Sequence, residues 1–242
     1  MKYFTEQWYN DTLVANMCFQ LRKSAKAATY SDDYFEKLYK KEQKVYLKYT
    51  KRMSKWLKEK YDEADAIADF ESNYKTNYSF INDNLPSEIS SQIADMRILA
   101  LGTATYDVAA QITKFCGTID RKCAKVLEEY ENSTGEIAEK YGFEKANKFY
   151  ALNDNMATRV DVDNDALIIE LDPNTVDVEN GQTDYFELED ANIICGQLNT
   201  ELTILCHELS IQEDDSDRLV LSLLCKSNDG EFSEFSVSFS NF

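Results

Sequence analysis

The apolar residues of this chain change their spacing near residue 150. Before that point they recur every three or four positions, which is the period of a helix. After it they alternate with polar residues, as in strands that have one face on a core. Helices followed by strands are typical of the α+β class. We predict a helical N-terminal module over 1–152, followed by a small antiparallel β-sheet module over 153–242.

Helix-start and helix-end residues divide the first module further. Its first 150 residues contain one proline, so long helices are permitted. Ser31 is a good N-cap before two acids, and Ser133 and Glu136 have the spacing of a capping box. Two predicted helices cover 5–28 and Ser31 to about Tyr61, and a third begins at Pro86. A fourth begins at Thr103 or Thr105 and continues through Tyr130, and a short fifth helix runs from Ser133 to Gly142.

The second module reads as short strands separated by polar turns. In its last strand, Phe235, Val237 and Phe239 share one face, which we expect to lie on a core. Glu234, Ser236, Ser238 and Ser240 share the other face, which we expect to lie in water. The predicted strands cover 165–171, 185–195, 202–211, 218–226 and 231–239.

Negative charge is concentrated in the last third of the chain. The segment 158–242 holds 20 acidic and three basic residues, a net charge of −17. The segment 1–157 holds 24 acidic and 23 basic residues, a net charge of −1. An acidic module repels nucleic acid and anionic lipid and attracts cationic partners. We therefore predict a basic protein as partner and disfavour nucleic acid.

This asymmetry favours a non-enzymatic protein-interaction module. By analogy, immunity proteins and inhibitors that mask basic nucleases carry such surfaces. Solubility alone is the alternative explanation for the charge. The predicted partner-binding residues are acids that we expect to be exposed: Glu187, Glu189, Asp190, Glu213, Asp214, Asp215 and Asp217.

A basic segment over 37–60 contains ten Lys or Arg residues and two acids, a net charge of +8. Its apolar residues recur at helical steps, so we predict a stripe packed on neighbouring helices with solvated lysines outside. One alternative is a helical scaffold that contacts RNA through these residues. Another is docking against the protein's own acidic module. The stripe comprises Leu38, Val45, Tyr49, Met53 and Trp56.

Signals for catalysis or metal binding are weak. Asp161, Asp163 and Asp165 have the rhythm of a calcium loop, but Ala166 stands where that loop needs glycine. We interpret this stretch as a hairpin turn with Asn164 at its tip. A competing hypothesis is a divalent-metal-dependent carboxylate enzyme, in which these three aspartates would be the metal ligands. We predict no cofactor and no metal site.

The only histidine, His207, lies within an apolar run, and we predict that it is a packed or a surface residue and not a general base. Alternation along a strand places Glu208 on the opposite face, which weakens the two as a catalytic pair. No stretch approaches the length of a membrane span, and the first residues do not resemble a secretory signal. Six scattered cysteines suit a reducing compartment. We expect a cytoplasmic protein without a membrane partner.

Two motifs carry a family resemblance. The opening stretch, Met1 to Tyr9, reads MKYFTEQWY, and the central stretch, Asp95 to Gly102, reads DMRILALG. Together they resemble a bacterial family described only as a domain of unknown function. The likeness extends over most of the chain and implies the same helix-then-sheet architecture without an activity. Where the family pattern has a His-Asp step before the first strand, this chain has Asn153 and Asp154, so a metal or base role there is not carried over.

Overall fold

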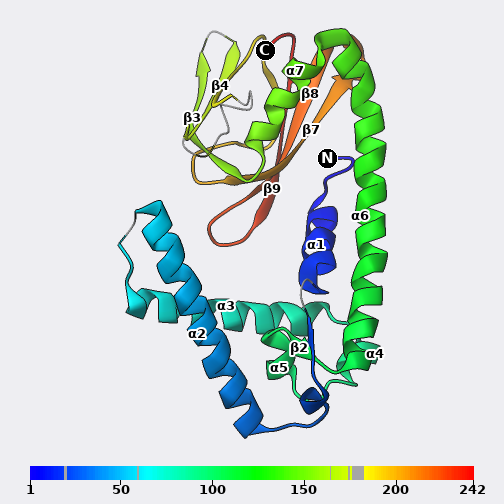
Figure 1. The fold of residues 1–242 in the computed structure, drawn as a ribbon. Coiled ribbons are helices and arrows are strands. Elements are labelled where there is room, and N and C mark those ends of the chain that lie inside the picture. The colour runs from blue at the N-terminus through cyan, green and yellow to red at the C-terminus, as the bar shows by residue number, and fades with distance from the viewer. Residues whose placement is uncertain (19–20, 59, 164, 174, 176–182) are drawn as a thin grey trace. The chain divides into compact units, whose positions relative to one another are not determined.

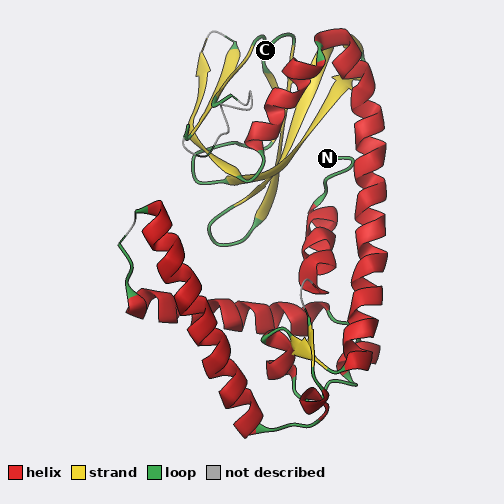
Figure 2. Cartoon of the chain, viewed as in Figure 1, coloured by secondary structure: helices red, strands yellow, loops and turns green. Residues whose placement is uncertain are grey.

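The computed structural model describes residues 1–18, 21–58, 60–163, 165–173, 175 and 183–242 (Figure 1). The chain forms two compact units. The helical unit comprises Thr12–Asp120, and the sheet unit comprises Met1–Asp11 together with Arg121–Phe242. Helices precede an antiparallel sheet along the chain (Figure 2), so the predicted α+β class is confirmed.

Seven α-helices are present among the described residues. Ser31 caps the second of them, as predicted, because its Oγ accepts a hydrogen bond from the Tyr34 amide at 3.2 Å. The Thr105 hydroxyl accepts from the Val108 amide at 3.3 Å at the start of the long sixth helix. The helices are α1 Glu6–Ala15, α2 Asp32–Leu57, α3 Glu63–Asn84, α4 Ser87–Ser90, α5 Met96–Ala100, α6 Tyr106–Tyr141 and α7 Phe143–Lys148.

Two helix predictions were wrong. The first helix stops at Ala15 and is followed by a 3₁₀ turn, so it does not reach residue 28. The predicted capping box does not start a helix, because α6 runs unbroken through Ser133 to Tyr141. The Ser133 hydroxyl instead donates to the Tyr130 carbonyl at 2.7 Å, a bond available inside a continuous helix. Gly142, at φ +95°, follows the end of α6.

The helical unit has two buried clusters. One, around Ile112, Cys116 and Leu99, joins α3, α5 and α6. The other joins α2, α3 and α5 through Leu38, Phe70 and Ile98. A short parallel pair, β1 Arg22–Lys23 with β2 Thr103–Ala104, ties the segment before α2 to the segment after α5.

The sheet unit contains a seven-stranded antiparallel sheet in the order β5-β4-β3-β7-β8-β9-β6. Figure 1 shows β7, β8 and β9 side by side, and these three long strands form its centre. The strands are β3 Asn155–Asp163, β4 Ala166–Leu171, β5 Tyr185–Leu188, β6 Asn192–Cys195, β7 Thr203–Gln212, β8 Asp215–Lys226 and β9 Phe232–Phe239.

The strand predictions needed three changes. The stretch 185–195 is two strands, because the chain turns between them at Asp190, where φ is +53°. Residues 155–163 form β3, which is absent from the predicted strands. In β9, Phe235, Val237 and Phe239 are buried as predicted, but Ser236 and Ser238 are buried too.

Both faces of the central strands are covered. On one face, Phe149 and Leu152 pack with the main apolar cluster of the sheet. On the other face, Phe4 and Tyr130 pack against Cys206 and Leu224. The Glu208 carboxylate anchors the N-terminal segment there by accepting hydrogen bonds from the Lys2 amide at 2.8 Å, the Tyr3 amide at 2.6 Å and the Phe4 amide.

The predicted boundary between 152 and 153 marks the change from helix to strand, since a 3₁₀ turn ends at Leu152 and β3 begins at Asn155. The compact units divide the chain elsewhere. Residues 1–11 and 121–152 belong with the sheet because Phe4, Tyr130 and Ile137 pack in its clusters. Among the described residues, no helix has the length and apolar composition needed to cross a bilayer.

Candidate functional site

All seven acids predicted to bind a partner are solvent-exposed. They come from three places in the sheet unit. Glu187 lies on β5, and Glu189 and Asp190 lie between β5 and β6. Glu213 and Asp214 lie at the turn between β7 and β8, and Asp215 and Asp217 lie at the start of β8. We call these seven residues the acidic surface.

Two contacts position the segment between β5 and β6, which carries Glu189 and Asp190. The Ala191 amide donates to the Asp165 carbonyl at 2.6 Å, which joins the segment between β5 and β6 to the β3–β4 turn. Arg218, at the start of β8, forms an ion pair with Asp190. The segment between β5 and β6 therefore lies near the β3–β4 turn and near the start of β8, which carries Asp215 and Asp217.

Part of this negative charge is neutralised locally. Asp190 pairs with Arg218, and Asp217 lies 2.9 Å from Lys140 Nζ. Glu187 accepts a hydrogen bond from the Tyr185 hydroxyl at 3.1 Å, and Glu189 accepts one from the Asn241 amide at 3.1 Å. Among the described ion pairs, none includes the other five acids: Glu187, Glu189, Glu213, Asp214 and Asp215.

The second charged surface is the outer face of α2, where the predicted packing was wrong. Leu38 is buried, but Val45 is 56 %, Tyr49 is 52 % and Trp56 is 75 % exposed. α2 carries another apolar row, including Tyr39 and Leu38, and α3 covers that row through Phe70. The row Val45–Tyr49–Trp56 points away from that contact and stays in solvent.

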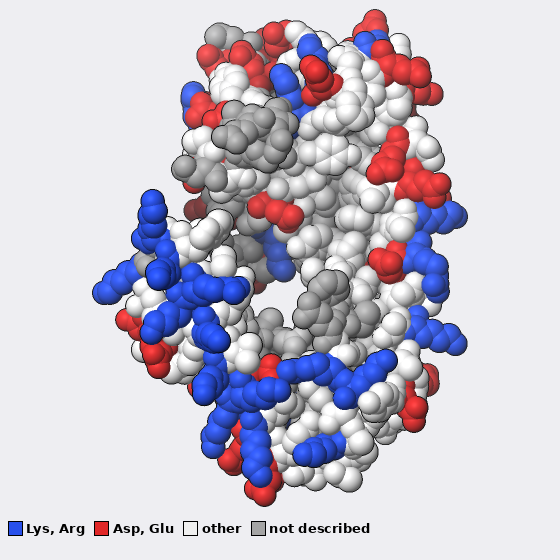
Figure 3. All heavy atoms as spheres, viewed as in Figure 1, with Lys and Arg blue, Asp and Glu red and all other residues white. Residues whose placement is uncertain are grey.

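Lysines and arginines surround these exposed apolar residues. All ten basic residues between 37 and 60 are exposed, and Figure 3 shows Lys and Arg gathered along α2. In the described part of the chain, only Lys40 of the ten lies in an ion pair, 3.5 Å from Glu36. The Arg52 guanidinium lies 5.7 Å from the Tyr49 ring centroid. We call the α2 residues Val45, Lys48, Tyr49, Lys51, Arg52, Lys55 and Trp56 the basic aromatic face.

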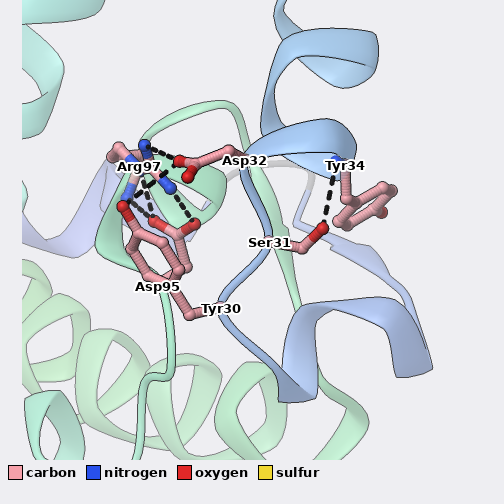
Figure 4. Close-up of polar contacts among 6 residues, drawn as sticks. All are labelled: Tyr30, Ser31, Asp32, Tyr34, Asp95 and Arg97. Carbon is pink, nitrogen blue, oxygen red and sulfur yellow. Dashed lines mark hydrogen bonds and ion pairs between the residues drawn. The ribbon is translucent and has the colours of Figure 1, made fainter.

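Asp95 and Arg97, from the central motif, form a structural ion pair (Figure 4). Asp95 caps α5 by accepting from the Arg97 amide at 3.1 Å, and its carboxylate accepts from Arg97 Nε at 2.9 Å and Nη2 at 2.8 Å. Asp32 accepts from Arg97 Nη1 at 2.9 Å. The guanidinium also lies over the rings of Tyr30 and Phe35, at 4.4 and 4.5 Å. This pairing with Asp95 raises the pKa of Arg97 and holds the segment before α2 against α5.

His207 is a core residue, which is one of the two placements that the sequence left open. It is 2 % exposed, and burial lowers its pKa to about 3, so the imidazole is neutral. Its Nδ1 lies 2.8 Å from Asn153 Oδ1, and because an amide oxygen only accepts, Nδ1 carries the proton. Glu208 contacts the N-terminal segment on the opposite face of β7, so the two side chains do not act as a pair.

Asp161, Asp163 and Asp165 lie on a β-hairpin. Asp163 pairs with Ala166 across a two-residue turn, and Asp165 has φ +67°. Asn164, predicted at the tip, lies outside the described residues. Asp161 forms an ion pair with Arg159 at 3.1 Å. Within the described residues, no three His, Cys, Asp or Glu side chains gather in a way that would hold a metal ion.

Comparison with family models, with curated proteins and with solved structures found no match to this chain. The resemblance to a bacterial family of unknown function therefore stays a prediction. The two motifs that suggested it have structural partners in this chain. The opening motif is anchored by Glu208, and the central motif supplies the Asp95–Arg97 ion pair.

Proposed function

We propose that this protein is a non-enzymatic, cytoplasmic interaction protein that binds or masks a basic protein through its acidic surface. The supporting observation is that five of the seven acids are exposed and lie in no described ion pair. A field of one sign speeds encounter with an oppositely charged partner and rejects partners of like charge. The sheet unit holds 29 acidic and 10 basic residues, a net charge of −19, which extends that field.

The test neutralises only those acids of the acidic surface that lie in no described ion pair. A variant with Glu187→Gln, Glu189→Gln, Glu213→Gln, Asp214→Asn and Asp215→Asn keeps Asp190 and Asp217, which hold Arg218 and Lys140. Full-length protein captures partners from a source-cell extract at low salt, and mass spectrometry identifies them. We expect a basic protein that the parent retains, that salt releases and that the variant fails to retain.

A control variant neutralises five exposed acids outside the sheet unit: Asp65→Asn, Asp69→Asn, Glu71→Gln, Asp83→Asn and Glu88→Gln. It removes the same number of negative charges, so if net charge alone mattered, both variants would lose the basic protein to the same extent. If the parent, the variant and the control variant all retain the same basic protein, or if none of them does, the proposal is refuted.

The basic aromatic face supports a second candidate, binding of single-stranded RNA. Exposed rings flanked by cations stack on bases while the cations contact phosphates. The positive charge is confined to one of two neighbouring helices, because α3, which packs beside α2, carries five acids and one lysine. A flat anionic membrane would contact both helices, including the acids of α3, whereas a single strand of RNA can contact α2 alone. The helical unit as a whole is nearly neutral, with 16 basic and 15 acidic residues.

The chain has two tryptophans, so a Trp8→Phe background leaves Trp56 as the only tryptophan reporter. A single-stranded RNA of about 20 nucleotides should quench its fluorescence without a blue shift. In the Trp8-containing chain, Tyr49→Leu and Trp56→Leu should each weaken binding about tenfold, because stacking contributes about 1–3 kcal/mol per base. Tyr78→Leu on α3 is the matched control. A blue shift with anionic vesicles and no RNA binding would assign this face to a membrane instead.

A further inference from the structure

β3 has an open edge. Its first residues, Asn155 and Met156, pair with β7, but from Arg159 to Asp163 it pairs with β4 only. Among the described residues, no strand lies on its other side over that stretch. The outward amide of Val162 donates instead to the side chain of its neighbour, at 3.0 Å from Asp161 Oδ1. An edge of this kind offers unpaired backbone groups to another chain.

Burial falls steeply toward this edge. Leu188, Leu167 and Val162 lie in one row across β5, β4 and β3 and share a face of the sheet. Leu188 is 0 % and Leu167 is 2 % exposed, whereas Val162 is 61 % exposed. The row is covered except at its end, so one more strand beside β3 would bury the side chain that is now in solvent.

A hollow of about 270 Å³ lies next to this edge. Val160, Val162 and Leu167 line it from the hairpin, and Ile193 lines it from β6. Gly196, Gln197, Leu198, Asn199, Phe235 and Asp161 complete its lining. β6 is the last strand of the sheet, and all four of its residues are exposed, including Ile193 at 49 %. The hollow thus accepts apolar side chains between two strand edges.

The opposite face of the same edge holds more acids than bases, and its one cation on β3, Arg159, pairs with Asp161 at 3.1 Å. Asp161, Ile168 and Glu187 form one row across β3, β4 and β5, so Asp161 and Glu187 share a face. Asp163 lies two residues beyond Asp161 and is exposed. A strand added beside β3 would place alternate side chains next to these acids, where opposite charges pair favourably.

We infer that the open edge of β3 takes up an extended segment of the basic partner as an additional strand. The segment alternates apolar residues, which enter the hollow beside Val162, with basic residues, which face Asp161 and Asp163. Backbone hydrogen bonds supply affinity and the alternating side chains supply selectivity. This inference rests on the proposed function, and it assigns the partner's chemistry and the place where it binds.

The test uses a labelled eight-residue peptide of alternating lysine and valine, followed by fluorescence anisotropy. Two isomers carry N-methyl groups, one on all valines and the other on all lysines. In a strand, alternate amides point to opposite edges, so each isomer blocks one edge of the peptide. We expect one isomer to bind like the parent peptide and the other to bind at least about tenfold more weakly, because it loses several hydrogen bonds.

Val162→Lys should weaken parent-peptide binding about tenfold by blocking the apolar contact and adding repulsion. Val45→Lys is the matched control, because Val45 is an exposed valine at 56 % and lies in the helical unit. Thermal melts verify that both variants fold. Amide hydrogen exchange over 159–163 should slow when the parent peptide binds.

Equal binding of both isomers would overturn strand addition while leaving charge-driven binding by the acidic surface intact. Absence of parent-peptide binding, or equal effects of the two valine variants, would also overturn it. If the protein alone is a dimer that Val162→Lys dissociates, a second copy fills the edge and the inference is wrong. Loss of the captured protein on acid neutralisation tests the proposed function independently.

Discussion

The basic aromatic face of α2 and the acidic surface of the sheet unit are both dense in charge, but the basic residues of the two regions differ in how many have a described contact. On α2, one of eight cations lies in a described ion pair. In the sheet, Arg159 and Arg218 pair with acids, and Lys226 lies 4.9 Å from the Phe232 ring centroid. All three basic residues of the segment 158–242 thus have an assigned contact.

This difference separates charges that hold the fold from charges that face solvent. Asp190 counts toward the −17 of the acidic segment, yet it is paired with Arg218. Lys48 and Lys55 count toward the +8 of the basic segment, and both are exposed. Net charge measured over a segment therefore overstates the charge available to a partner where cations and anions are interleaved.

The largest expected effect concerns a structural charge. Arg97→Met should destabilise the protein by about 3–5 kcal/mol, because it leaves the Asp95 carboxylate, 1 % exposed, without its cation. Urea unfolding measures the change. Lys140→Met breaks an exposed pair with Asp217 and should cost at most about 1 kcal/mol. Equal effects of the two substitutions would erase the distinction between structural and solvent-facing charge.

The second prediction concerns a group that the fold keeps neutral. The pKa of His207 is about 3 in the folded protein and near 6.5 in the unfolded chain. Between these values the unfolded state binds more protons, so stability falls as the pH falls. The loss attributable to His207 should be about 2 kcal/mol between pH 7 and pH 5.

Comparison with His207→Asn, which retains a donor near the Nδ1 position, isolates this contribution from those of the carboxylates. Denaturant unfolding at several pH values gives the difference in slope between the two proteins. Identical slopes would mean that His207 takes up a proton in the folded state.

The smallest expected effect is on α2. Replacing Lys44, Lys48 and Lys55 by Gln should change the free energy of unfolding by no more than about 0.5 kcal/mol, because these exposed side chains form no described ion pair. Urea unfolding measures it. A loss above about 2 kcal/mol would show that these lysines hold the fold, and it would remove the basis for treating this face as available.

The sequence predicted the features that depend on local spacing. The change from a helical to an alternating period gave the α+β class, and Ser31 was identified as an N-cap from its position before Asp32 and Asp33. Periodicity did not reveal which apolar face of α2 is covered. α2 carries two such rows, and only contact with α3, through residues such as Phe70, determines that Tyr49 stays outside.

The candidate site depended still more on distant contacts. Exposure of the seven acids was predictable, because Asp and Glu side chains mostly lie at the protein surface. Their partial neutralisation was not, because Lys140 and Asp217 are 77 residues apart in sequence. The open edge of β3 was missed because the aspartates of 161–165 suggested a turn, although Val160 and Val162 alternate with them as in a strand. That alternation was the sequence feature that could have identified β3 as a strand.

The anchoring of residues 2–4 by Glu208 has a consequence for the order of folding. More than 200 residues separate these partners, and the helical unit lies between them in sequence. During synthesis, Thr12–Asp120 is complete long before β7 emerges, and domains generally fold as units as they are made. Residues 1–11 then lack their contacts with Glu208 until β7 has been synthesised. Closing so long a loop makes the sheet unit the slower of the two to fold.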